Sequence, residues 1–242
     1  MLNFSKKKIS FKYIIIFSDL ISLMKNNMKF NKTLSEVEKI VKILIKNNNT
    51  IILPTFNLNF PITKKSSNDV NFITTGYLTK FLLKKFDFKR TNKPMYNYAV
   101  IGPNEKKILN LKQSTAWGKD SVIRFLSQNK RTLGIGVNTN LYDFFWVTIH
   151  SCEEYLKVPY RFYKTFYGKN KNTNKKFNEK VFVRYQNKLK KDLQQKMILE
   201  KLVDKKKLIT LKGSYIKYNI IDLRDYYMDN LKHLKKILIL KR

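Results

Sequence analysis

The stretch around His150 holds residue types that could carry out acid–base chemistry. His150 is one of only two histidines in the chain, and Glu153 and Glu154 follow it closely. If residues 146–156 form a helix, positions three and four apart share a face, so Glu153, and Glu154 with it, would project beside the imidazole. A histidine beside a carboxylate and among apolar residues is typical of a general base working near neutral pH. The alternative is a core histidine next to a surface pair of glutamates.

The single cysteine, Cys152, offers no disulfide. On a helix, positions two apart point in nearly opposite directions, so its thiol would not meet the His150 ring, and we expect it to pack in the core. His150-x-x-Glu153 also differs from the zinc-binding His-Glu-x-x-His pattern, and we expect no metal. What remains is a base without its own nucleophile. Such a site suits a substrate that brings the nucleophile, such as a sugar amine that attacks a thioester.

The composition narrows the classes of protein. The chain of 242 residues is 43% hydrophobic and carries 50 Lys and Arg against 17 Asp and Glu, a net charge of +33. One interpretation is a basic nucleic-acid-binding protein. The charge is spread over the whole length, however, and Lys far exceeds Arg, the residue that reads bases and clamps phosphates. We therefore expect no nucleic-acid partner and interpret the charge as a diffuse field that favours polyanionic ligands such as coenzyme A or a nucleotide-linked sugar.

The amino-terminal segment imitates a signal peptide only loosely. Its apolar part ending at Phe17 is short, Asp19 interrupts it, and no small-residue cleavage site follows. No run in the sequence approaches the roughly 18 apolar residues that a membrane span needs. We expect a cytoplasmic protein without a membrane span, and the sequence is compatible with an oligomer.

A strand–helix–strand unit is predicted near the amino terminus. Residues 13–17 are β-branched and compact, as in a buried strand that ends at Ser18 and Asp19. Residues 33–36 form a capping-box pattern that begins a helix with apolar residues at helical spacing. Residues 51–53 indicate a second buried strand, stopped by a proline. This order is typical of a right-handed parallel crossover.

Further elements are expected along the rest of the chain. The sequence predicts helices over 76–86, 120–127, 185–202 and 222–240 and strands over 98–102 and 131–137. It also predicts a hairpin over 208–219 and a polar loop over 168–176. The helix over 185–202 is basic and amphipathic, and we interpret it as a surface helix rather than an RNA-binding one. No internal repeat or linker is evident, so we expect one domain spanning residues 1–242.

Seven motifs follow one another in a set order. They are Ser18–Leu20, Thr50–Phe56, Gly76–Phe81, Arg90–Pro94 with Tyr98–Gly102, Trp117–Ser121, Leu133–Val137, and Thr148–Glu154 with Val158–Arg161. In this order and spacing they resemble the aminoglycoside 3-N-acetyltransferase family, in particular its branch associated with amino-sugar acetylation in surface-glycan pathways. The resemblance extends over about residues 13–240.

The resemblance implies an α/β fold different from that of the GNAT acetyltransferases, with a central, mostly parallel sheet and flanking helices. It also implies acetyl-CoA as the donor, direct transfer to an amine, and a small-molecule amino sugar as the acceptor, either nucleotide-linked or within an aminoglycoside. A relative of such acyltransferases that has lost turnover and serves as a scaffold is a further alternative.

The same resemblance assigns roles to individual residues. His150 would be the base, and Glu153 would orient it or bind the acceptor amine. The turns of the cleft would contact coenzyme through a set of residues that could equally be turn or cap residues: Ser18, Asp19, Thr55 and Ser121. Asp143 and Glu154 are expected on the acceptor side, although Asp143 could also pair with His150 or punctuate a loop.

Two further points concern residues near these motifs. Tyr160 and Arg161 are interpreted as structural residues. The family usually has a histidine where this chain has Phe17, which affects either coenzyme affinity or acceptor choice.

Overall fold

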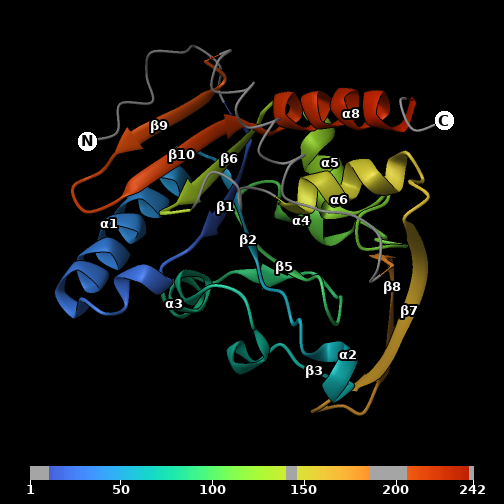
Figure 1. The fold of residues 1–242 in the computed structure, drawn as a ribbon. Helices are drawn as coiled ribbons and strands as arrows, with labels where there is room; N and C mark the ends of the chain where they lie inside the picture. Colours follow the sequence, from blue (N-terminus) through green and yellow to red (C-terminus); the bar gives the residue numbers. More distant parts are fainter. Residues whose placement is uncertain (1–10, 140–145, 186–205, 240–242) are drawn as a thin grey trace.

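The computed structural model describes residues 11–139, 146–185 and 206–239. Its centre is a seven-stranded sheet in the order β4-β5-β2-β1-β6-β10-β9 (Figure 1). Three neighbouring strands of this sheet are parallel: β2 (Thr50–Pro54), β1 (Tyr13–Ser18) and β6 (Thr132–Val137). The outer strands add antiparallel pairings on both sides: β5 (Tyr98–Ile101), β4 (Lys89–Arg90), β10 (Lys217–Asp222) and β9 (Leu208–Lys212).

Strand β1 lies in the middle of the sheet and is buried on both faces. Tyr13 and Ile15 belong to one apolar cluster, whereas Ile14 and Ile16 belong to a second. Because successive side chains of a strand point to opposite faces, a run of consecutive apolar residues forms a strand that is covered on both sides. This strand therefore places its carboxyl end, at Ser18, in the middle of one edge of the sheet.

Helices cover the two faces (Figure 1). The buried residues of α1 (Asn27–Lys46) and α3 (Tyr77–Lys85) pack into the cluster of Ile14. Buried residues of α5 (Val122–Gln128), α6 (Trp146–Tyr155) and α8 (Leu223–Ile239) pack on the opposite side, and these three helices contact one another. The short helical segments lie in the connections: η2 (Ile21–Leu23), α2 (Phe60–Thr63), η3 (Val70–Phe72) and α4 (Glu105–Leu109).

The α/β class with flanking helices is confirmed, but the sheet is mixed, and the expected parallel arrangement holds only for its three central strands. Two of the outer pairings, β4 with β5 and β9 with β10, join strands that are close in sequence, since a short connection suffices for antiparallel strands. The turn between β9 and β10 is one example, with the Gly213 amide donating to the Ile216 carbonyl at 2.7 Å. The hairpin and the terminal helix predicted in this region are confirmed, as are the helices now labelled α3, α5 and α6.

The predicted start of helix α1 was wrong. The helix begins at Asn27, and the side chain of Asn26 accepts from the Lys29 amide at 3.0 Å. Thr33 and Glu36, the expected capping box, lie inside the helix, where Thr33 is buried. The earlier start is favoured because Phe30 extends the buried stripe by one turn beyond the predicted start.

A long hairpin stands beside the main sheet. Strands β7 (Arg161–Asn170) and β8 (Lys176–Arg184) pair antiparallel, and β3 (Lys65–Ser66) joins β7 to give a three-stranded sheet. The polar loop predicted over 168–176 is confirmed with narrower bounds, since residues 171–175 form the turn and its flanks belong to β7 and β8. The helix predicted over 185–202 lies, apart from Tyr185, outside the described residues.

The hairpin is attached to the rest of the fold by a buried carboxylate. Glu179 is 1% exposed and accepts the backbone amides of Met95, at 2.8 Å, and Tyr96, at 3.2 Å. Burial raises the pKa of this carboxyl to about 7, and the two amide hydrogen bonds only partly oppose the rise. Glu179 therefore holds β8 against the loop before β5 while carrying a desolvation cost when it is ionised.

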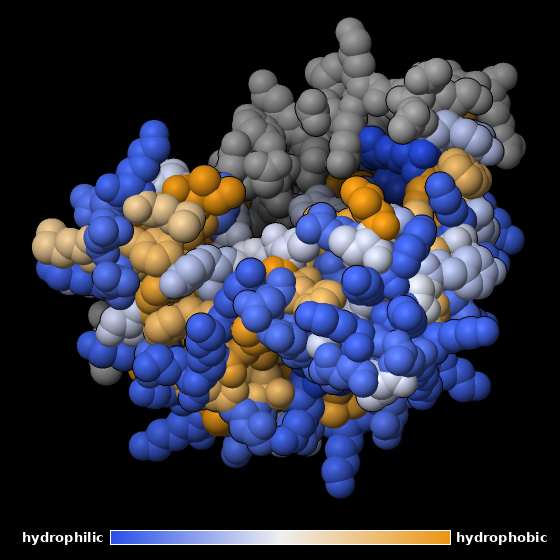
Figure 2. All heavy atoms as spheres, turned by 90° about the horizontal axis from the view of Figure 1, so that it is seen from below, coloured by the Kyte–Doolittle hydropathy of each residue, from blue (hydrophilic) through white to orange (hydrophobic). Residues whose placement is uncertain are grey.

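The face of the molecule seen in Figure 2 is covered mainly by hydrophilic residues, with hydrophobic residues visible between them. No helix within the described ranges combines the length and the apolar character needed to cross a membrane.

The stability of the protein should fall with pH because of Glu179. Its folded pKa of about 7 lies above the unfolded value of 4.5, so the folded state binds the proton more tightly and loses this advantage as pH rises through that interval. Glu179→Gln keeps an acceptor for the amides without the charge. We expect the difference in free energy of unfolding, variant minus wild type, to increase by about 2 kcal/mol when the pH is raised from 5 to 8. Urea unfolding of both proteins at each pH measures this difference.

The matched control is Glu105→Gln, which makes the same change at a half-exposed position in α4. A stability difference between Glu179→Gln and the wild type that is constant over this pH range would contradict the prediction.

Candidate active site

A pocket of about 550 Å³ opens where the three parallel strands end. Its lining includes Ser18 and Asp19 at the end of β1, Pro54 at the end of β2, and Thr139 just after β6. In open α/β sheets, ligands bind at the carboxyl ends of the strands, where connections leave to opposite sides of the sheet. The volume lies within the usual range for small-molecule sites. The sheet therefore creates the pocket at the position expected for a ligand.

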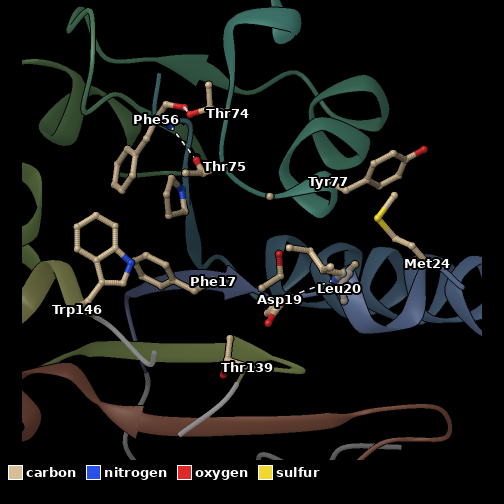
Figure 3. A pocket seen from close by; sticks show the side chains of 14 residues that line it. Phe17, Asp19, Leu20, Met24, Phe56, Thr74, Thr75, Tyr77, Thr139 and Trp146 are labelled. Atoms are coloured by element: carbon tan, nitrogen blue, oxygen red, sulfur yellow. Dashed lines mark hydrogen bonds between the residues drawn. The ribbon is translucent and has the colours of Figure 1, made fainter. Parts of the chain in front are cut away.

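Four of the 14 residues that line the pocket are aromatic. Phe17, Phe56 and Trp146 lie together at one end, and Tyr77 and Met24 lie toward the other (Figure 3). The rings of Phe56 and Trp146 meet edge to face with centroids 6.1 Å apart. Phe17, which stands where the family that the sequence resembles usually has a histidine, thus lines the pocket.

His150 lies next to this aromatic end. It follows Trp146 by one turn of α6, with ring centroids 5.1 Å apart, and its other side faces Trp117 at 5.6 Å. The residue is 9% exposed. His150 is not among the residues that line the pocket, whereas its ring neighbour Trp146 is.

Glu153 lies one helical turn beyond His150 and has no exposed surface. Its Oε2 is 2.8 Å from His150 Nδ1 and 2.6 Å from Arg161 Nη2. Its Oε1 accepts from the Tyr160 hydroxyl at 3.1 Å and from Arg184 Nη2 at 2.9 Å. Both carboxylate oxygens are therefore occupied by donors from the protein itself. The predicted His150–Glu153 contact is present in the structure.

The protonation state of Glu153 follows from these contacts. Burial alone would raise the pKa of the carboxyl, but the hydrogen bond and attraction from His150 and the charges of Arg161 and Arg184 outweigh it and lower the pKa to about 2. Glu153 is thus an anion over the physiological range. An anion accepts hydrogen bonds only, so it favours the imidazole tautomer that carries its proton on Nδ1. The lone pair of a neutral ring is then on Nε2, as a general base requires.

Glu154 is turned toward different partners. Its Oε1 accepts from the Thr115 hydroxyl at 2.6 Å and from the Tyr163 hydroxyl at 3.3 Å, and the residue is 6% exposed. Burial raises its pKa, although these hydrogen bonds and Arg124 oppose the rise. Its role in acceptor binding stays a prediction from the sequence; in the structure, two hydroxyl groups donate to its carboxylate.

The four residues predicted to contact coenzyme divide into two pairs. Ser18 and Asp19 line the pocket. Thr55 is fully buried and donates to Asn97 Oδ1 at 3.2 Å, and Ser121 is fully buried and accepts from the Arg124 amide at 3.3 Å as the cap of α5. For Thr55 and Ser121 the structure shows these packing and capping contacts, and a coenzyme contact stays a prediction.

Asp143 lies outside the described residues. Cys152 is fully buried against Tyr227 and Leu234, as expected for a packing residue. Among the residues that the structure describes, no group of three or more His, Cys, Asp or Glu side chains is placed to hold a metal ion.

Sequence reasoning missed the basic partners of Glu153. Tyr160 and Arg161 were interpreted as structural residues, although they belong to a motif of the family resemblance, and their side chains contact Glu153 directly. Arg184 carried no signal at all, because it reaches Glu153 only through the pairing of β7 with β8, in which Arg161 lies opposite Arg184.

The sequence matches no protein-family model and no curated protein. The structure, in contrast, is similar to solved aminoglycoside acetyltransferases. AAC-VIa bound to sisomicin has a TM-score of 0.70 at 11% identity, over 94% of this chain and 92% of that one. AAC(3)-IVa as the apoenzyme gives 0.69 at 14% identity, over 93% and 82%, and AAC-IIIb with CoASH gives 0.69 at 9% identity, over 95% and 92%.

These similarities confirm the fold implied by the sequence motifs: the chain has the α/β fold of the aminoglycoside acetyltransferases. The TM-scores of 0.69 to 0.70 establish the shared fold, and sequence identities of 14% or less carry no statement about activity.

Glu153 should be indispensable to the stability of this region. Glu153→Gln removes the anion and leaves Arg161 and Arg184 buried or half-buried without their counter-charge. We expect the free energy of unfolding to fall by about 3 kcal/mol in urea titrations at pH 7. Glu154→Gln, on the next residue of the same helix, is the matched control and should cost clearly less. A loss below about 1 kcal/mol for Glu153→Gln would contradict the importance of this anion.

Proposed function

We propose that the protein is an acetyl-CoA-dependent N-acetyltransferase that modifies the amine of an amino sugar, with His150 as the general base. The observation that carries the proposal is the buried Glu153 anion, 2.8 Å from Nδ1 of an imidazole next to Trp146 at one end of the pocket. The fold shared with acetyltransferases supports it.

The proton transfer follows from the tautomer that Glu153 favours. With Nδ1–H donating to the carboxylate, His150 accepts a proton at Nε2 from the amine, which makes the nitrogen lone pair available for attack. The positive ring that results remains in contact with the anion. In this proposal Glu153 orients the ring and does not bind the acceptor amine, because its two oxygens already accept from His150, Tyr160 and the two arginines.

The pocket has the character that a pantetheine arm requires. Such an arm is narrow and mostly apolar with a few amide groups, and the lining combines aromatic rings with a few hydroxyls, among them those of Ser18, Thr74 and Thr75. Acetyl-CoA would supply an activated acetyl thioester. Residues Ser18 and Asp19 are the coenzyme contacts that we propose from the predicted set, since both line the pocket.

Two kinds of acceptor have specific support. A structural neighbour bound to sisomicin supports an amine within an aminoglycoside. The net charge of +33 supports a nucleotide-linked amino sugar, because a positive field attracts phosphates and repels polycations. We propose the amino sugar as the common element of both.

Basic nucleic-acid binding is the alternative suggested by the charge. It predicts RNA or DNA binding whose affinity falls steeply with salt and is indifferent to substitution of His150. A scaffold without turnover would bind coenzyme A, measured by calorimetry, and release no thiol from acetyl-CoA.

Acetyl transfer should depend on His150. His150→Ala removes the base, so we expect kcat to fall by roughly 10²–10⁴, measured by thiol release from acetyl-CoA with a panel of aminoglycosides and amino-sugar nucleotides. His233→Gln, at the only other histidine, is the matched control and should keep normal turnover. Near-normal activity in His150→Ala would refute the assignment of the base.

A further inference from the structure

The charges around His150 form an unusual set. In many histidine–carboxylate pairs the carboxylate is the main charged neighbour and strengthens the attraction of the ring for a second proton. Here Glu153 also contacts two guanidinium groups, of Arg161 and Arg184. The side chains of the glutamate and the two arginines are 0%, 5% and 22% exposed, so water screens their interactions poorly. With a neutral ring, this cluster of one anion and two cations already has a net charge of +1.

Arg161 contacts both members of the pair. Its Nη2 is 2.6 Å from Glu153 Oε2 and 2.7 Å from His150 Nδ1. Its Nη1 donates to the Phe182 carbonyl of β8 at 2.7 Å, which fixes the plane of the guanidinium. Arg161 has only donors, so its Nη2 and a protonated Nδ1 share Oε2 of Glu153 as their acceptor, and the guanidinium charge beside the ring disfavours a second proton there. Arg184 and Tyr160 hold the other carboxylate oxygen.

We propose that Arg161 and Arg184 are positioning residues for the base: they fix the Glu153 carboxylate at the Nδ1 edge of His150, and their charges keep the ring neutral. The carboxylate selects the tautomer, and the guanidinium groups offset the attraction that it would otherwise exert on a second proton. The result is a ring held in the form that accepts a proton at Nε2.

Other charged groups near α6 have partners of their own. Glu154 is held by Thr115 and Tyr163, and Arg124 of α5 donates to the Ser151 carbonyl. On β8, Glu179 is bound to the amides of Met95 and Tyr96. Of the charged residues described above, Arg161 and Arg184 are the cations in direct contact with Glu153, and Arg161 also contacts His150.

The inference rests on the proposed function, since a neutral base matters only if His150 accepts a proton. It is nevertheless measurable without any turnover. The chain has only two histidines, so ¹⁵N NMR of the imidazole groups in a His233→Gln background reports on His150 alone.

In that background the neutral ring should show the proton on Nδ1. Arg161→Met removes one positive charge, and we expect the midpoint of the His150 titration to rise by about one pH unit. Arg184→Met should raise it in the same direction but less, because Arg184 contacts only the far oxygen of the carboxylate. Arg184 is also the more exposed of the two arginines, so this variant gives the answer if Arg161→Met does not fold.

The matched control is Arg131→Met, which makes the same change at an exposed position before β6 and should leave the midpoint unchanged. Arg161→Lys keeps the charge and should leave the midpoint closer to the parent than Arg161→Met does. A neutral ring protonated on Nε2, or unchanged midpoints in Arg161→Met and Arg184→Met, would overturn the proposal. Shifted midpoints without acetyl transfer would refute the proposed function and leave this assignment standing.

Discussion

The organisation of this protein depends on one buried anion. Glu153 has no contact with solvent, yet donors from His150, Tyr160, Arg161 and Arg184 keep it charged. A carboxylate so deeply buried is tolerated only when every oxygen is satisfied and opposite charges are close. Helix α6 and the base of the β7–β8 hairpin must therefore meet in one arrangement, and that arrangement also fixes the orientation of the imidazole.

The main sheet contributes the other half of the site. Three parallel strands end together and leave a pocket whose wall contains Phe17, Phe56 and Trp146. Trp146 belongs both to the pocket and to the helix of His150. Through this residue the cavity at the sheet edge and the charged cluster behind it become one site. In the proposed acetyl transfer, the pocket would hold the coenzyme arm and the charged cluster would orient the base, so both halves would be needed.

The part of the site that could be predicted from the sequence is the local part. His150 and Glu153 lie three apart on one helix, so their contact follows from helical geometry alone. Arg184 lies 31 residues from Glu153 and reaches it through the register of a hairpin that has no clear sequence signal. Ser121 shows a different limit, because a serine before a helix is compatible with both a cap and a ligand contact, and only packing distinguishes them.

The difference between local patterns and long-range contacts also explains which parts of the fold could be predicted. Buried strands β1 and β2 were evident as apolar runs, and the crossover between them follows from their separation. The antiparallel strands at the edges depend on pairing between distant segments, which local pattern does not encode. Helix α1 was predicted to begin about two turns too late, because a good capping pattern inside a helix looks identical to one at its start.

The pairing of Arg161 with Arg184 determines where the β7–β8 hairpin can change in length. These residues are the first and last of the two strands, so the ribbon is anchored at its open end, and β3 pairs with Lys169 and Asn170 near the other. Beyond that second anchor, the bend at residues 171–175 can gain or lose length without displacing either guanidinium. Insertions in this bend should be neutral for chemistry, whereas a single-residue deletion between the anchors would turn the side chains on one side of the deletion to the wrong face.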